Sequence, residues 1–138
     1  MAAGDCPPGD AREFSAWRLH LAERIASHID PARFGVKAVY LLGSAKAWTA
    51  GPSSDIDLLV LFDGTPAQRE QLALWLEGWS LCLDEVNALR TGRRTGGLLD
   101  VHVITEDDIA SRTSYAVKIG SPTDPARRLP LGEASRTT

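Results

Sequence analysis

The stretch of sequence that decides the fold is LLGSAKAWTAGPSSDIDLLVL, residues 41–61. Gly43 and Ser44 follow an apolar run, and Asp55 and Asp57 open a second apolar run after ten further residues. Two carboxylates at the start of a buried strand are costly to desolvate unless a cation binds them. A Gly-Ser pair between a strand and a helix is suited to holding phosphate through backbone N–H groups. The stretch therefore indicates metal-assisted chemistry on a nucleotide.

The length and the net charge of the chain limit the classes of function that fit. With 138 residues, the chain has room for one domain with a sizeable core. The net charge of −3 gives no overall basic field that would favour binding to nucleic acid or to an anionic membrane. The paired arginines at 93–94 and 127–128 are typical of solvated loops.

The sequence carries no pattern of secretion or membrane insertion. Cys6 and Cys82 fit neither a disulfide framework nor a metal knuckle. No hydrophobic stretch approaches the roughly 20 residues that span a bilayer. Residues 1–10 lack the charged-then-apolar pattern of a signal peptide. We therefore expect a cytoplasmic protein that does not act at a membrane.

The N-terminal part of the chain predicts one helix after a flexible lead-in at residues 1–10. Asp10 and Glu13 have the spacing of a capping box. Apolar residues then recur at helical spacing through residues 14–29. The Asp-Pro pair at 30–31 is expected to end this helix, because the residue before a proline disfavours the helical conformation.

Three apolar stretches predict the strands of a sheet. The first is mostly apolar and rich in β-branched or aromatic residues, the second is apolar behind its two acids, and the third is apolar apart from Asp100 and His102. Each is bounded by glycine or by a turn cluster. The stretches are residues 36–42, 55–62 and 98–104. A capping signal at Thr65, Pro66 and Gln68 begins a helical stretch that reaches about residue 90. We expect a single long helix there in preference to two helices broken near Gly78.

Shorter elements are expected around these strands. Residues 44–50 predict a short helix or helical turn, and Thr105 with Asp108 predicts the start of another short helix. The alternating residues 114–119 fit an edge strand with one solvated face. Prolines at 122, 125 and 130 argue against a regular element beyond residue 120.

Together these elements predict an α/β fold of the α+β kind. Helices are expected to flank a small mixed sheet of about three to five strands in a single domain. We expect this domain to cover residues 11–119 and an irregular C-terminal extension to cover residues 120–138.

The expected strand directions bring a third carboxylate to the first two. The long helix between residues 55–62 and 98–104 allows these strands to be parallel neighbours. Asp100, near the start of the later strand, then lies at the same end of the sheet as Asp55 and Asp57. Residues i and i+2 of a strand share a face, so the two earlier carboxylates project together. Carboxylates in this arrangement suit a pair of Mg²⁺ ions, which would stabilise the attacking and leaving oxygens of a phosphoryl displacement.

These residues resemble the catalytic motif of the DNA polymerase β-like nucleotidyltransferase superfamily. The resemblance rests on Gly43-Ser44, ten residues, then Asp55-Ile56-Asp57 between two apolar strands, and on Asp100 in LLDVHVI. The stretch TAGPSSDI is similar to a loop of the kanamycin nucleotidyltransferase family, and the small size resembles the minimal nucleotidyltransferases. The resemblance covers roughly residues 10–112.

This resemblance implies transfer of a nucleoside monophosphate from a nucleoside triphosphate to an acceptor hydroxyl, with release of pyrophosphate. It implies that Ser44, with backbone N–H groups near Gly43, binds the β- and γ-phosphates, and Lys46 is the candidate for a positive charge toward them. We expect ATP as the nucleotide. The acceptor is left open as a protein, a small molecule or a nucleic-acid end.

The resemblance also implies a metal site made by the three aspartates. Asp55 and Asp57 would bridge two Mg²⁺ ions, with Mn²⁺ as an alternative. Asp100 would hold the catalytic ion and help to activate the acceptor hydroxyl. His102 shares a strand face with Asp100, but it fits a packed, hydrogen-bonded histidine equally well and is left outside the catalytic set. Arg93 and Arg94 are further candidates for contacts to phosphate or acceptor.

The segment after Ser44 departs from the pattern of the resembled family. Relatives often carry an Arg and a Gly there, whereas this chain has Ala45-Lys46-Ala47-Trp48. No helical acceptor-binding domain is expected after the core, so either the domain itself, a partner chain or a second copy supplies that surface. Two alternatives therefore stay open: a nucleotide-binding regulatory module with weakened catalysis, and an antitoxin that nucleotidylates a partner protein.

Overall fold

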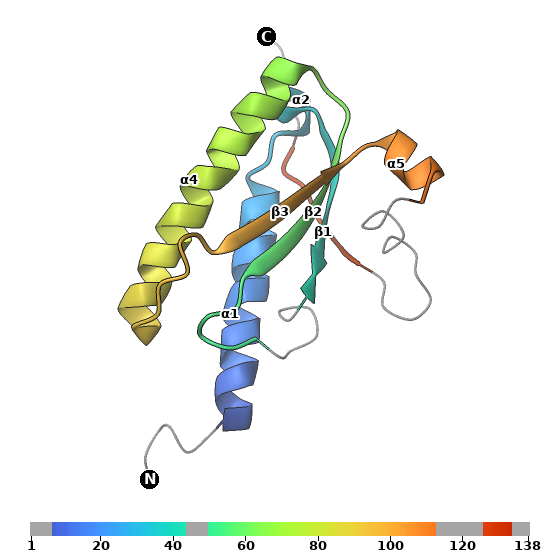
Figure 1. Cartoon of the computed structure of the whole chain (residues 1–138). Helices are drawn as coiled ribbons and strands as arrows, with labels where there is room; N and C mark the ends of the chain where they lie inside the picture. Colours follow the sequence, from blue (N-terminus) through green and yellow to red (C-terminus); the bar gives the residue numbers. More distant parts are fainter. Residues whose placement is uncertain (1–6, 44–49, 113–125, 134–138) are drawn as a thin grey trace.

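The computed structural model describes residues 7–43, 50–112 and 126–133. The elements follow in the order α1 (Pro7–Ser27), α2 (Pro31–Phe34), β1 (Val36–Leu42), β2 (Ile56–Phe62), α4 (Pro66–Thr91), β3 (Leu99–Ile104), α5 (Glu106–Ala110) and β4 (Arg127–Leu129). The long helices α1 and α4 pack against the sheet, and α5 projects from its far side (Figure 1). None of the helices in these ranges is long and apolar enough to cross a membrane.

The strands form one mixed sheet in the order β3-β2-β1-β4. β2 and β3 are parallel, which the 26-residue helix α4 between them makes possible. β1 is antiparallel to both β2 and β4. From the third position onward, every residue of β1 and β2 is buried, as expected of central strands. The predicted mixed α/β architecture and the predicted directions of the first three strands are confirmed.

The two faces of the sheet contact different apolar clusters. Ile56, Leu58 and Val60 of β2 pack in the larger cluster with residues of α1 and α4. Leu59 and Leu61, which alternate with them, pack in a smaller cluster with residues of β1 and α5. We call the face against α1 and α4 the helix face, and the opposite one the open face.

The N-terminal helix differs from its predicted boundary. α1 begins at Pro7, so Asp10 lies inside the helix and is not its N-cap. Residues 7–10 are accordingly helical and not part of an irregular lead-in. A proline is compatible with the first turn of a helix, because the N–H groups there have no partner within the helix.

The Asp-Pro pair begins a helix as well as following one. α1 already ends at Ser27. The Asp30 carboxylate accepts hydrogen bonds from the N–H groups of Ala32 (3.1 Å) and Arg33 (3.2 Å), and it thereby caps α2. Pro31 occupies the first turn of α2, where its fixed φ suits the helix. From the sequence, only the end of a helix was predicted at this pair.

The long helix α4 begins where its capping signal predicted. The Thr65 hydroxyl accepts a hydrogen bond from the Gln68 N–H (3.1 Å), and the Gln68 side-chain oxygen accepts one from the Thr65 N–H (2.9 Å). The helix runs as one element to Thr91 and ends at Gly92, whose φ of 77° suits glycine. The predicted cap of α5 at Thr105 is present as well.

The C-terminal region contains a strand that the sequence analysis excluded. β4 pairs with the edge of β1, and its Leu129 lies opposite Val39 and is buried on the helix face. Pro130 directly follows this strand, which is tolerated because one side of an edge strand pairs with no neighbour. The expectation of an irregular extension is therefore wrong for β4. The predicted edge strand at residues 114–119 and the predicted helical turn after Gly43 lie outside the described residues.

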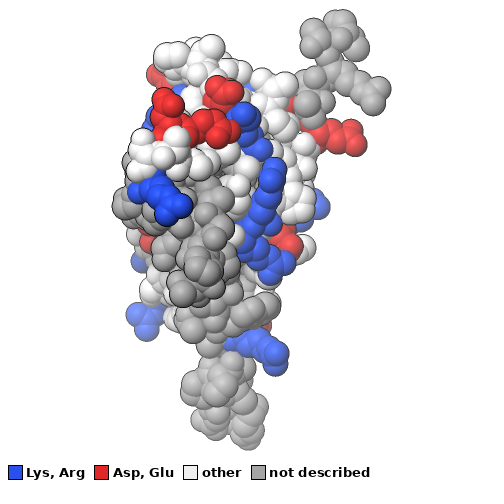
Figure 2. All heavy atoms as spheres, turned by 90° about the vertical axis from the view of Figure 1, so that its right-hand side faces the viewer, with Lys and Arg blue, Asp and Glu red and all other residues white. Residues whose placement is uncertain are grey.

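Charged side chains of both signs cover the side of the molecule that carries α5 and β4. Lys and Arg form a band there beside a group of Asp and Glu (Figure 2). The Nζ atom of Lys37 lies 3.2 Å from a carboxylate oxygen of Glu106, and the Arg127 guanidinium lies 3.9 Å from that of Glu23. Both pairs are exposed to solvent, so each contributes little to stability.

Candidate metal and nucleotide site

Two carboxylates meet where β2 and β3 begin, on the open face of the sheet. The parallel pairing places Asp57 directly opposite Asp100, and His102 lies two residues further along β3 on the same face. Ligand atoms of these three side chains all lie within 4.8 Å of one another. Nε2 of His102 is 3.3 Å from Oδ2 of Asp100. The structure thus brings Asp57 and Asp100 together and adds His102 to them.

The electrostatics of this cluster favour a bound cation. The pKa of Asp57 is raised from 3.8 to about 6, first by burial, and then by a hydrogen bond with Asp100 and by the negative charges of Asp100 and Asp55. Neighbouring carboxylates repel each other when both are ionised. A divalent cation removes this repulsion, and Mg²⁺ prefers oxygen ligands of this kind. The donor set on these strands therefore fits a metal ion.

Gly43 is matched to the Asp57 carboxylate. Its φ of 75° lies in the left-handed region, which a side chain disfavours. A Cβ atom built on Gly43 would also overlap Oδ2 of Asp57. Glycine at this position therefore lets the end of β1 approach the carboxylate closely. Ser44 and Lys46, the other predicted nucleotide contacts, lie outside the described residues.

Asp55 stands slightly apart from the close cluster. It precedes β2 and is exposed, and it is not among the three residues whose ligand atoms converge. Its charge nevertheless reaches the site, since it helps to raise the pKa of Asp57. Partial burial and the Asp100 charge raise the pKa of Asp55 itself, while Arg18 lowers it. Asp55 therefore belongs to the same electrostatic site, at its rim.

The turn that leads to Asp55 is held by buried polar side chains from two helices. From α1, the Ser15 hydroxyl accepts a hydrogen bond from the Ala50 N–H (3.0 Å), and Nε of Arg18 donates to the Ser54 carbonyl (2.8 Å). From α4, the Asn87 amide donates to the carbonyl of Pro52 (2.8 Å). We call Ser15, Arg18 and Asn87 the turn clamp.

Arg18 is the central member of the turn clamp and was missed by the sequence analysis. It is fully buried, and its guanidinium also contacts Asn87 Oδ1 (3.3 Å) and the Pro52 carbonyl (3.4 Å). Burial and the nearby Arg90 lower the pKa of Arg18, whereas Asp55 raises it. A buried guanidinium needs acceptors, and the turn carbonyls supply them. The available signal was one arginine within the apolar side of a helix.

The loop before β3 is held by hydrogen bonds to the buried carboxylate of Asp84. Asp84 of α4 accepts hydrogen bonds from the N–H groups of Thr95 (2.8 Å) and Gly96 (3.2 Å). Arg94 in this loop pairs with Glu85, with Nη2 at 3.0 Å from Oε1. Arg94, a candidate for phosphate contacts in the sequence, is therefore engaged on the surface of α4.

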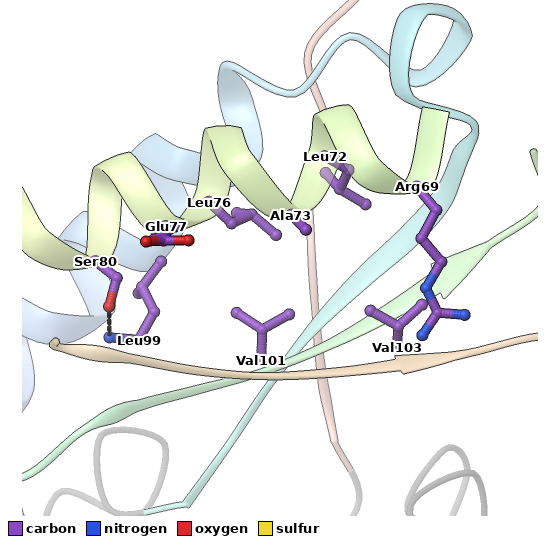
Figure 3. Close-up of a pocket in the computed structure, with 9 residues that line it drawn as sticks. All are labelled: Arg69, Leu72, Ala73, Leu76, Glu77, Ser80, Leu99, Val101 and Val103. Atoms are coloured by element: carbon purple, nitrogen blue, oxygen red, sulfur yellow. Dashed lines mark hydrogen bonds between the residues drawn. The ribbon is translucent and has the colours of Figure 1, made fainter. Parts of the chain in front are cut away.

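A separate pocket lies on the opposite face of β3. It has a volume of about 330 Å³ and lies between α4 and β3 (Figure 3). Leu99, Val101 and Val103 line its strand side, and they alternate along β3 with Asp100 and His102. Because successive residues of a strand point to opposite faces, this mostly apolar pocket is distinct from the carboxylate site.

Comparison with known proteins identifies the class of domain. Residues 24–114 match the family model described as Polymerase beta, Nucleotidyltransferase, which is about two thirds of the chain. The matched region contains Gly43 and all three predicted aspartates. Comparisons with curated proteins and with solved structures gave no significant match.

Proposed function

Because this chain belongs to the polymerase β nucleotidyltransferase family, we propose that it transfers a nucleoside monophosphate from a nucleoside triphosphate to an acceptor hydroxyl, with Mg²⁺ as cofactor and pyrophosphate as product. A general nucleotidyltransferase function follows from the family match. The metal, the nucleotide and the acceptor are the parts that the proposal adds.

The observation that carries the proposal is the in-register pair of Asp57 and Asp100. These carboxylates come from strands joined by a 26-residue helix, and they face each other at the start of both strands. Gly43 at the end of β1 lies against the same carboxylate. This closeness supports the proposal that the triphosphate and its metal bind side by side.

In the proposed reaction, the acceptor oxygen forms a bond to the α-phosphorus and the bond from this phosphorus to the β-phosphate oxygen breaks. The proton of the acceptor hydroxyl leaves by way of Asp100. Asp57 and Asp100 would hold the metal, with Asp55 as a further ligand from the rim. A bound Mg²⁺ supplies charge neutralisation at the phosphate oxygens. The chain's own contribution is mainly positioning, which the clamped turn and the paired strands provide.

We infer the substrates from the sequence and not from the shape of a pocket. We propose ATP as the nucleotide, with Ser44 and Lys46 on its phosphates. The acceptor is a protein, a small molecule or a nucleic-acid end, and its binding surface comes from this domain, from a partner chain or from a second copy.

The proposal is tested with nucleoside triphosphates labelled at the α-phosphate. ATP, GTP, CTP and UTP are each incubated with Mg²⁺, the protein and candidate acceptors, and label transfer and pyrophosphate release are measured. Asp57→Asn and Asp100→Asn are expected to lower the rate by at least about 100-fold, because each removes a ligand of the charge-neutralising ion.

The control for these variants is Asp107→Asn, which changes an exposed aspartate on α5. It is expected to keep the wild-type rate. Nucleotide binding without pyrophosphate release would instead favour the regulatory module. Absence of both binding and release at millimolar nucleotide and Mg²⁺ would refute the proposed function.

A further inference from the structure

His102 lies beside the two carboxylates but has no part in the mechanism proposed above. One of its ring nitrogens and one oxygen each of Asp57 and Asp100 lie within 4.8 Å of one another. Metal–ligand bonds of about 2.0–2.6 Å place the ligands of one ion at separations up to roughly twice that length. The three side chains are therefore close enough to bind a single ion together.

The main chain keeps His102 on the side of the carboxylates. His102 lies opposite Leu59 in the parallel ladder of β2 and β3. Its neighbours Val101 and Val103 pack against the larger apolar cluster on the helix face. The alternation of the strand thus keeps the imidazole on the open face. Its side chain is 22% exposed, so it is mostly enclosed but accessible to a small ion.

We propose that His102 is a nitrogen ligand of the ion held by Asp57 and Asp100, and that the site prefers a first-row transition-metal ion such as Mn²⁺ to Mg²⁺. This inference rests on the proposed function, which places a metal at the two carboxylates. Mg²⁺ takes oxygen ligands and gains little from an imidazole. Imidazole suits first-row ions such as Fe²⁺, Ni²⁺ and Zn²⁺, and Mn²⁺, which takes the same carboxylate oxygens as Mg²⁺, also accepts an imidazole nitrogen more readily than Mg²⁺ does. A site of two oxygens and one nitrogen therefore shifts the preference away from Mg²⁺.

A histidine beside a carboxylate has an alternative role, which is to orient that carboxylate by a hydrogen bond. The 3.3 Å separation between Nε2 of His102 and Oδ2 of Asp100 is within reach of that role. The two roles differ in what touches the metal. Only a ligand nitrogen lies at bonding distance from the ion, where it couples to the electron spin of Mn²⁺.

The experiment adds Mn²⁺ to the full chain without nucleotide. Pulsed electron paramagnetic resonance detects imidazole nitrogen coupled to Mn²⁺, and competition with Mg²⁺ gives the ratio of the two affinities. The wild-type protein is expected to show the coupling. His102→Gln is expected to lose it and to lower the Mn²⁺-to-Mg²⁺ affinity ratio on the order of 10-fold. His20→Gln, at an exposed position of α1, is the matched control and keeps both properties.

The outcomes separate this inference from the proposed function. Coupling that is absent from the wild type, or that persists in His102→Gln, overturns the inference even where nucleotidyl transfer with Mg²⁺ is observed. Absence of saturable Mn²⁺ binding at millimolar concentration overturns it as well. Coupling that depends on His102 supports the nitrogen ligand. If the same protein transfers no nucleotide, the proposed reaction is refuted while this ligand assignment stands.

Discussion

The helix face and the open face of the sheet are made by alternate residues of the same strands, yet they carry different chemistry. On the helix face, Ile56 and Leu58 are fully buried against α1 and α4. On the open face, Asp57 lies between them in sequence and meets Asp100. One residue step along β2 therefore separates a core position from a site position, because side chains alternate across a strand.

The two faces differ in the room that the fold leaves for reactive groups. The helix face is completed by two long helices, and the buried charge of Arg18 on α1 is stabilised by hydrogen bonds to carbonyl and amide oxygens. Among the described residues, the open face carries a small apolar cluster beyond the carboxylates. The beginnings of β2 and β3 on this face combine a rigid backbone with access for a charged ligand. In the proposed function, core packing and metal binding thus belong to opposite faces of one sheet.

The largest expected effect is a difference in stability between substitutions at two neighbouring residues of β2. Leu58→Ala is expected to lower the free energy of unfolding by about 2–5 kcal/mol, because it opens a cavity on the helix face. Asp57→Asn, one residue earlier, is expected to keep or raise that free energy without metal, because it removes an ionisable group with an unfavourable environment. Urea denaturation measures the free energy of unfolding of both variants, and equal losses would contradict the expected difference between the two faces.

The next effect is expected at the contact between Gly43 and Asp57. Gly43→Ala is expected to lower the free energy of unfolding by about 1–2 kcal/mol through its left-handed backbone, and to weaken metal binding by displacing Asp57. Gly92→Ala is the control, since Gly92 has a similar φ of 77° but nothing within 4 Å of an added Cβ. Metal affinities that fall equally in both variants would show that the contact between Gly43 and Asp57 does not affect metal binding.

A loss of stability of similar size is expected in the turn clamp, where side chains of α1 and α4 hold the turn before β2. Arg18→Met removes the guanidinium donor to the Ser54 carbonyl and one of the two side-chain donors to the Pro52 carbonyl, so we expect a loss of about 1–3 kcal/mol of unfolding free energy. Hydrogen exchange should accelerate over residues 50–54. Arg24→Met, at an exposed position of the same helix, should leave both measurements unchanged.

Arg18 also marks the limit of what the sequence predicted. Local signals were sufficient for the caps at Thr65 and Thr105 and for the in-register carboxylates, because each depends on spacing along one or two elements. The turn clamp depends on backbone carbonyls more than thirty residues away. β4 depends on pairing with β1, since its own residues are flanked by proline. Tertiary partners decided both of these features.

The smallest effect is a dependence of stability on pH in the absence of metal. The pKa of Asp57 is raised from 3.8 to about 6, so the folded state binds its proton more tightly than the unfolded state does. The contribution of Asp57 to stability is therefore complete below about pH 4 and is lost as the pH rises through about 6. Urea denaturation in chelator between these pH values should show this loss in the wild type, and less of it in Asp57→Asn. Identical pH profiles would contradict the raised pKa.

The most direct test of the account is the metal-linked change in the free energy of unfolding at neutral pH. Mg²⁺ or Mn²⁺ at about 100 times its dissociation constant should stabilise the wild-type protein by about 2.7 kcal/mol, because the ion binds only the folded carboxylate pair. The same concentration should stabilise Asp57→Asn far less. Equal stabilisation of both proteins, or none in the wild type at millimolar metal, would contradict the assignment of this end of the open face as a metal site.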